Sequence, residues 1–377
     1  MIGEDAHLGD LRVTSRAVVF FPDPPENLYQ IRQWYQSLRE LDKRMGVTLI
    51  TQDSRTGRAL RAETDLNVLV VATTRTVAQL VARGDARIAI YVGHANANAV
   101  CQRSTHVAHV FLAHGDSDKS VSVSNQVKGF DFTLVAGQAA VERYRSTVLF
   151  FDAETRLRII GRPQLPDQSE RSGPTTILYA PTWEGSQEAN AYSSVKDFGY
   201  AIIDSLLRDS DVQVIYRPHP RTGASDRTYR DADARIRALV AAHPRRASTD
   251  TTTDGGAALQ RADLLISDIS AMCSDWLSQC RPIIITVPKA ELAVPTMPSR
   301  LVRVVPRIGE SEAFDTVRIV RAALADDQLT ERIASLRDYY LGGLTGDEAM
   351  ERFLDTCEEI AAERDREFAA KELPHVR

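Results

Sequence analysis

Side chains that can transfer protons or bind phosphate directly follow apolar runs at four places in the sequence. The first is Val110–Ser120, where an apolar run ends in His114-Gly115 and the chain stays polar through Lys119. His114 suits a general base, because the unperturbed pKa of histidine lies near neutrality. Gly115 lets the backbone turn sharply beside a ligand, and Lys119 with a helix start at Val121–Gly129 could hold a phosphate or an acidic acceptor. The alternative is a turn histidine that only satisfies local hydrogen bonds.

Two further places lie in the second half of the chain. After one apolar run, Thr182 could donate to a phosphate and Trp183 could wall a nucleotide pocket, although a buried structural tryptophan fits the same pattern. After another, His219 stands between two prolines, which restrict its backbone strongly. This stiffness favours a side chain whose position matters, and Arg217 and His219 could donate hydrogen bonds to a diphosphate. A loop that is merely stiff is the alternative.

The fourth place is Ala262–Ala271, where an apolar run leads into hydroxyls and an acid just before a helix. Ser267, Asp268 and Ser270 lie near the start of that helix, whose free N–H groups make a ready anion site. Plain N-capping by serine or aspartate explains the same residues. Because ligands of open parallel sheets bind beyond the carboxyl ends of the strands, we expect all four places to face one cleft.

Two parallel sheets are needed to position these side chains. Short apolar runs alternate with amphipathic stretches, which is typical of parallel strands buried on both faces. We expect strands in the first half at Ala17–Phe21, Val47–Thr51, Leu66–Ala72, Ile88–Val92, His109–Ala113, Phe132–Ala136 and Arg156–Ile160. After a linker at 161–174, we expect strands at Thr176–Ala180, Val212–Tyr216, Leu264–Ser267 and Pro282–Val287. This predicts an α/β protein with two doubly wound, Rossmann-like domains facing an interdomain cleft, which is the plan of GT-B transferases and of a few epimerases.

The predicted helices complete the two domains. One long helix at Thr345–Lys371 ends the chain, and we assign residues 1–165 to the first domain and 166–377, with the C-terminal helices, to the second. A helix at Glu26–Arg44 has an apolar side formed by Ile31, Trp34, Tyr35, Leu38 and Leu41. We expect this side to pack on the sheet. A peripheral contact with a membrane is the alternative.

Composition and missing motifs exclude several classes of protein. A net charge of -5 over 377 residues lacks the basic excess of a nucleic-acid binder. Met1–Arg12 lacks the basic start and apolar stretch of a signal peptide, and no apolar run reaches the roughly 20 residues of a membrane span, so we expect a cytoplasmic protein. The four cysteines form no CxxC pair and no histidines have zinc spacing. The P-loop, GxGxxG, HExxH and GxSxG patterns are also missing.

Two Asp-Ser-Asp triplets leave a metal-dependent transfer open as an alternative. They are Asp116–Asp118, which overlaps the His114 loop, and Asp209–Asp211, which fits a polar turn before the next strand. A three-residue pattern is weak, and protein cations can themselves neutralise a phosphate. We therefore expect no metal and no cofactor.

In order and rough spacing, the four places resemble the CDP-glycerol glycerophosphotransferase family, the teichoic-acid polymerases and primases of bacterial cell walls. The matching residues are His114-Gly115 with Lys119, Ala180-Pro181-Thr182-Trp183, Arg217-Pro218-His219-Pro220 and Asp263-Leu264-Leu265-Ile266-Ser267-Asp268-Ile269-Ser270. The resemblance covers Val110–Leu277. It departs from the family at three positions, where Ile269 replaces a tyrosine, Ala271 a serine and Glu184 a common arginine.

The resemblance implies a GT-B fold, a CDP-linked polyol donor bound by residues 166–377, and a lipid-linked or polymeric acceptor on the side of residues 1–165. It also implies that His114 activates the acceptor hydroxyl, that His219 lies near the donor diphosphate and that Ser270 contacts a phosphate. We therefore expect transfer of a polyol phosphate to a cell-wall or capsule-type polymer, at the inner face of the membrane. The changed donor loop leaves glycerol phosphate, ribitol phosphate or another donor open.

Two other functions fit the same cleft. One is a GT-B glycosyltransferase or sugar-nucleotide epimerase that uses a UDP or CMP sugar. The other is a binding protein that kept the fold and lost the reaction, which the changes at Ile269 and Ala271 would allow.

Overall fold

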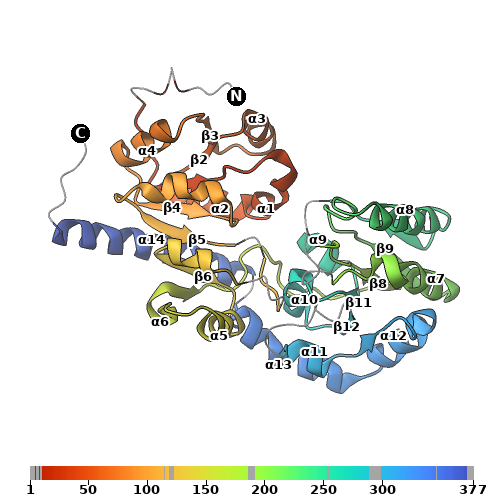
Figure 1. Ribbon diagram of the computed structural model, residues 1–377. Coiled ribbons are helices and arrows are strands. Elements are labelled where there is room, and N and C mark those ends of the chain that lie inside the picture. Colours follow the sequence, from red (N-terminus) through yellow and green to blue (C-terminus); the bar gives the residue numbers. More distant parts are fainter. Residues whose placement is uncertain are drawn as a thin grey trace.

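The computed structural model contains two parallel sheets of seven and six strands, each in its own domain (Figure 1). It describes residues 5, 8, 11–113, 115–118, 123–185, 192–252, 255–287, 299–344 and 346–371. The prediction of an α/β protein with two doubly wound domains is therefore confirmed.

The first sheet has the strand order β3-β2-β1-β4-β5-β6-β7, and all neighbouring strands are parallel. Its strands form because uninterrupted apolar runs can be buried on both faces, as in β1, where all four residues are buried. The strands are β1 (Ala17–Phe20), β2 (Val47–Thr51), β3 (Asn67–Val70), β4 (Ile88–Tyr91), β5 (Ala108–Phe111), β6 (Phe132–Val135) and β7 (Leu157–Ile159). The helices of this part are α1 (Tyr29–Arg32), α2 (Tyr35–Met45), α3 (Ser54–Glu63), α4 (Thr74–Arg83), α5 (Gln138–Thr147) and α6 (Ala153–Arg156), with short 3-10 helices η2 (Pro25–Asn27), η3 (Asn96–Arg103) and η5 (Asn125–Gly129).

The second sheet has the order β10-β9-β8-β11-β12-β13 and is also parallel throughout. Its strands are β8 (Thr175–Tyr179), β9 (Val212–Tyr216), β10 (Ala247–Thr249), β11 (Leu264–Ser267), β12 (Ile283–Thr286) and β13 (Arg307–Ile308). The helices after β8 are α7 (Tyr200–Arg208), α8 (Arg227–Ala241), α9 (Gly255–Gln260), α10 (Ala271–Trp276), α11 (Arg300–Val304), α12 (Thr316–Leu324), α13 (Asp327–Leu341) and α14 (Gly346–Ala370), with the single-turn helices η7 (Val195–Gly199), η8 (Leu277–Gln279) and η9 (Ala313–Asp315).

The stretch that was predicted as one helix at 26–44 is broken into η2, α1 and α2. Its apolar side packs into the core of the first domain, and Trp34 and Leu38 are almost completely buried there. The expectation that this side packs on the sheet is therefore confirmed. In the part of the chain that the structure describes, no helix is long and apolar enough to cross a bilayer.

The last helix, α14, contradicts the assignment of all C-terminal helices to the second domain. Phe353, Leu354 and Cys357 of α14 lie in the same apolar core as β1 and β2. Arg44 at the end of α2 also forms ion pairs with three acids of α14. Figure 1 shows α14 running along the first domain, with α13 below it against the second. The apolar stripe of α14 predicts that the helix is buried but does not predict which sheet it packs on. For this reason the prediction placed α14 in the wrong domain.

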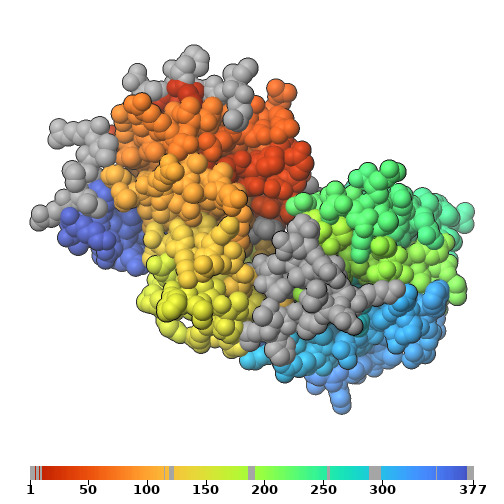
Figure 2. All heavy atoms as spheres, in the orientation of Figure 1, coloured from red at the N-terminus to blue at the C-terminus, as the bar shows by residue number. Residues whose placement is uncertain are grey.

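The carboxyl edges of the two sheets face each other. The loop after β1 leads to α1, and in Figure 1 this helix lies on the side of the first domain that is nearest to the second. Figure 2 shows the domains as two distinct masses that meet along one side, with the red start of the chain next to the green part of the second domain. Ligands of parallel sheets bind at such edges, so the loops after the strands are the place to look for a site.

Candidate active site

One buried carboxylate ties together three loops of the second domain. Asp268, which follows β11, is completely buried, and its oxygens accept hydrogen bonds from the Thr182 N–H at 2.7 Å and the Ser194 N–H at 3.2 Å. The Thr286 hydroxyl, at the end of β12, donates to the same carboxylate. Burial raises the pKa of Asp268, and the hydrogen bonds from its neighbours oppose that rise. The carboxylate thus fixes the carboxyl ends of β8, β11 and β12 relative to one another.

Ser267 and Asp268, two residues expected to bind the donor, lie within this frame of loops. The Ser267 side chain is fully buried, and its hydroxyl donates to the Ala180 carbonyl at 2.6 Å. The two side chains join the carboxyl ends of β8 and β11, and the Ser267 hydroxyl also lies 3.2 Å from the Ser270 hydroxyl. Their role as donor contacts stays a prediction.

A second buried carboxylate holds the loop after the Pro-bracketed histidine. Glu184 accepts from the N–H groups of Gly223 and Ser225, both at 2.9 Å, and from the Ser225 hydroxyl at 3.0 Å. Burial would raise the pKa of Glu184, but the backbone bonds from Ser225 and Gly223 outweigh it and the pKa is lowered. Glu184, one of the three departures from the family pattern, therefore anchors the loop after His219.

His219 lies on the exposed side of this frame, where several rings and charges surround its imidazole. The backbone N–H of Arg221 donates to His219 Nδ1 at 3.1 Å, so the neutral ring carries its proton on Nε2. The Trp183 ring lies nearly parallel to the imidazole, with 6.2 Å between centroids and 24° between planes. The Arg221 guanidinium in turn lies over the Trp183 ring, 4.2 Å from the ring centroid. An N–H donor held in this way suits an anionic oxygen of a diphosphate.

Arg217 and Ser270, two further residues expected to bind phosphate, differ in the partners that they already have. The Arg217 guanidinium lies 3.0 Å from the Asp250 carboxylate and donates to the Thr252 carbonyl at 2.9 Å. Asp250 therefore offsets part of the charge that Arg217 can offer to a diphosphate. Ser270 is half-buried at the N-cap of α10, and its hydroxyl lies 3.2 Å from the Ser267 hydroxyl.

On the first domain, the loop after β5 turns at a strained residue. Ala113 has a φ of 56°, a left-handed conformation that costs about 1–2 kcal/mol for a residue other than glycine. The Trp34 indole N–H donates to the Ala113 carbonyl at 2.8 Å and so holds the turn. His114 and Lys119, the predicted base and phosphate contact, lie outside the described residues. Ala113, the residue before His114, is nevertheless held by the hydrogen bond from Trp34, the N-cap residue of α2.

Gly115 brings the two domains into contact beside this turn. A Cβ atom at position 115 would lie 2.9 Å from the Ala271 Cβ of α10, closer than two carbon atoms can approach. Glycine at 115 and a small residue at 271 therefore allow the loop after β5 to meet the loop after β11. The change of serine to Ala271 lies at this contact, whereas Ile269 is buried in the core of the second domain.

The Asp-Ser-Asp triplets are engaged in ion pairs. The Arg143 guanidinium bridges Asp116 and Asp118, and the Tyr340 hydroxyl donates to Asp118 at 2.6 Å. Asp209 is likewise paired with Arg321 at 2.8 Å. A cation already occupies the position between the first pair of carboxylates. Among the described residues, no group of three or more histidine, cysteine or acidic side chains could hold a metal ion.

Three residues that lie at these edges were not predicted from the sequence as site residues. His94 follows β4 after Gly93, and its ring stacks on Phe111 of β5 with 4.3 Å between centroids. The rule that identified His114, a polar residue directly after an apolar run, would also have found His94. Tyr29 and Arg221 contact the cluster around His219, but no pattern in the sequence distinguishes them from ordinary surface residues.

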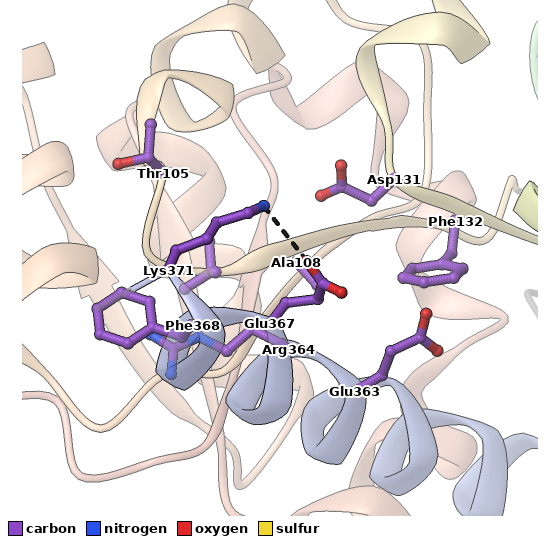
Figure 3. A pocket seen from close by; sticks show the side chains of 10 residues that line it. Thr105, Ala108, Asp131, Phe132, Glu363, Arg364, Glu367, Phe368 and Lys371 are labelled. Atoms are coloured by element: carbon purple, nitrogen blue, oxygen red, sulfur yellow. Dashed lines mark ion pairs between the residues drawn. The ribbon is translucent and has the colours of Figure 1, made fainter. Parts of the chain in front are cut away.

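A cavity of about 310 Å³ lies elsewhere, between the end of α14 and the amino ends of β5 and β6 (Figure 3). Its lining combines apolar Ala108, Phe132 and Phe368 with charged groups that are paired, such as Lys371 with Glu367 at 3.3 Å. It opens at the opposite edge of the first sheet from His94 and Gly115. The cavity is therefore separate from the interdomain site.

Comparisons with known proteins agree with this geometry. Residues 163–292 match the family model of CDP-glycerol:poly(glycerophosphate) glycerophosphotransferase. A solved structure of the wall teichoic acid polymerase TagF is 14% identical with a TM-score of 0.64, covering 96% of this chain and 93% of that chain. Anabaena HepE in complex with UDP and glucose is 12% identical with a TM-score of 0.54, covering 91% and 99%. A search of curated proteins found no match.

At such low identities, the solved structures show the fold alone, which is the two-domain GT-B-like arrangement. The family match is independent of them, and it spans the loops that carry Thr182, His219 and Ser270. The resemblance seen in the sequence is therefore confirmed over residues 163–292, which match the glycerophosphotransferase model.

Proposed function

We propose that this enzyme transfers a polyol phosphate from a CDP-linked donor to an acceptor hydroxyl of a cell-wall or capsule-type polymer. The observation that carries the proposal is the contact of Gly115 with Ala271. It supports the proposal because Gly115, which follows the proposed base, meets Ala271, which follows Ser270. TagF, a teichoic acid polymerase that has also been solved with CDPG, has a similar fold.

The reaction is a direct displacement at phosphorus. His114 takes the proton of the acceptor hydroxyl, whose oxygen attacks the donor phosphorus that bears the polyol. The bond from this phosphorus to the bridging oxygen breaks, and CMP leaves with the bonding electrons. His219, Arg217 and Ser270 donate to the oxygens of the leaving phosphate, and losing one such donor typically costs about 10²–10³ in rate.

The two histidines are supported by an agreement in spacing. Two of the solved TagF structures carry a substitution at a histidine, and the stretch between these two histidines is nearly as long as that between His114 and His219. We assign the acceptor side to the first domain, with Gly115 and Lys119 beside the acceptor, and the donor side to the second, with Thr182 and Trp183 near the nucleotide. A lipid-linked acceptor would place the enzyme at the inner, cytoplasmic face of the membrane.

The test is to incubate the enzyme with CDP-polyols and nucleotide sugars and to identify the released nucleotide. We expect CMP from a CDP-polyol, with full activity in excess chelator. His114→Ala should abolish turnover and leave the binding of the CDP-polyol nearly unchanged, since the base contacts the acceptor. Turnover of His114→Ala at the parent rate would show that another group is the base.

A second candidate is transfer from or epimerisation of a UDP or CMP sugar. The likeness to HepE, solved with UDP and glucose, favours it, since the same fold can hold a UDP sugar. Release of UDP, or a changed sugar nucleotide with no release at all, would replace the first proposal by this one.

A further inference from the structure

We propose that Tyr29 of the first domain is a positioning residue for His219 of the second. The inference rests on the proposed function, and it concerns a residue that lies outside the four motifs of the sequence. The Tyr29 ring meets the imidazole edge to face, with 5.6 Å between centroids and 75° between planes. His219 is therefore oriented by both domains, and its orientation is complete only when they lie together as in this structure.

His219 has contacts from both domains, with Trp183 and Arg221 from the second and Tyr29 from the first. Trp183 lies nearly parallel to the imidazole, and the Arg221 N–H fixes Nδ1 as an acceptor. These contacts set the tautomer and support the ring within its own domain. Tyr29 comes from another domain and meets the ring at a steep angle, so it limits rotation that a parallel neighbour permits. Separation of the domains would remove Tyr29 and leave Trp183 and Arg221 in place.

A rigid element presents Tyr29 at the edge of the first sheet. Ile31 and Trp34, on the same short segment, are anchored in the apolar core. On the other side, the Gln30 side chain packs on Gly93 of the loop after β4, where a Cβ would lie 2.3 Å from the Gln30 side-chain oxygen. Tyr29 therefore follows the first domain as a fixed body and cannot accompany His219 if the domains part.

This arrangement couples donor chemistry to the presence of the acceptor domain. In an open form, His219 would lack its contact with Tyr29. The diphosphate of a donor bound there would then be activated poorly. Closure would bring Tyr29 and the acceptor loop to the donor together. Wasteful transfer to water in the open form would thereby be limited.

The experiment compares Tyr29→Phe and Tyr29→Ala in CMP release from CDP-glycerol with acceptor present. Phenylalanine keeps the ring, so we expect kcat within about 2-fold of the parent. Alanine should lower kcat about 10-fold with donor KM changed less, because misplacement of a catalytic group affects the reaction more than binding. Tyr200→Ala, at a partly exposed tyrosine of α7, is the matched control and should behave like the parent.

A double-mutant cycle separates positioning from a general structural defect. In a His219→Ala background, Tyr29→Ala should have almost no further effect, because its action passes through the missing imidazole. A full 10-fold loss in that background, parent-like kcat for Tyr29→Ala, or an equal loss in Tyr29→Phe would each overturn the proposal.

A measurement without turnover keeps this inference distinct from the proposed function. In histidine-labelled protein, Tyr29→Ala should shift the imidazole Cε1–H resonance of His219, which His219→Ala identifies, since the tyrosine ring current is lost. An unchanged resonance would overturn the contact. If the parent releases no CMP from any CDP-polyol, the proposed function fails while this shift still reports on the Tyr29–His219 contact.

Discussion

The carboxyl edges of the two sheets are built in different ways. In the second domain, Asp268 and Glu184 accept hydrogen bonds from several loops, so its edge is held by buried carboxylates. In the first domain, the Trp34 indole N–H holds left-handed Ala113 before His114, and Arg143 and Tyr340 bind Asp116 and Asp118 after it. The second edge is thus held by carboxylates that gather backbone N–H groups, whereas the first edge is held by side chains that reach it from other elements. Substitutions in the two frames should therefore have different consequences.

The largest effect is expected from Asp268→Asn. The asparagine amide would direct its N–H₂ group toward the N–H and hydroxyl groups that now donate to the carboxylate, and the charge-assisted hydrogen bonds would be lost. We expect a cost of about 3 kcal/mol in the free energy of unfolding. Denaturant titration would measure the loss, with Asp211→Asn as the exposed control, expected to change stability by less than about 0.5 kcal/mol. Parent-like stability of Asp268→Asn would show that the second edge does not depend on this carboxylate.

A smaller effect on stability, with a specific effect on catalysis, is expected from Trp34→Phe. The change leaves the half-buried carbonyl of Ala113 without its donor and should cost about 1 kcal/mol in stability. Because the turn before His114 loosens, kcat should fall about 10-fold with donor KM unchanged. A rise in donor KM at constant kcat would contradict the separation of the two edges. The kinetics of CMP release at varied donor concentration would decide.

The smallest of the three effects concerns pH and lies in the first domain. Burial lowers the pKa of His109, whose Nδ1 accepts from the Tyr91 hydroxyl and whose Nε2 donates to the Ser104 carbonyl, both at 2.9 Å. The unfolded chain therefore takes up the proton first, so stability should fall as the pH drops below the ordinary value of 6.5.

Thermal unfolding between about pH 8 and about pH 5.5 would measure this dependence. His109→Gln should reduce the slope, whereas His243→Gln, at a surface helix end of the second domain, should keep it. An unchanged slope in His109→Gln would assign the pH dependence to another group.

Much of the fold follows from the sequence because the strands are continuous apolar runs. Most predicted strand ends agree with the structure within one or two residues. The edge strands β10 and β13 were missed, because Ala247–Thr249 and Arg307–Ile308 are too short to show a pattern. The partner of α14 could not be predicted, since an apolar stripe indicates burial and not the surface that buries it.

The site was predictable to the level of strand ends and no further. A position after a strand predicts the edge on which a residue lies, but it does not predict the direction of the side chain. Ser267 and Ser270 illustrate this limit, since three residues apart one is fully buried and the other half-buried at the interface. Tyr29 and Trp34 act across elements far apart in the sequence, and a single sequence carries no record of such contacts.

The most direct test of the central claim, that the two edges form one site, is a cross-link between Gly115→Cys and Ala271→Cys. The positions lie close enough for a disulfide after a small adjustment. Mild oxidation of the folded double variant should form this bond, seen by mass spectrometry, and stop CMP release until a reductant is added; neither single variant should respond. If the bond forms only in denaturant, or not at all, the loops do not meet in solution and the account is contradicted.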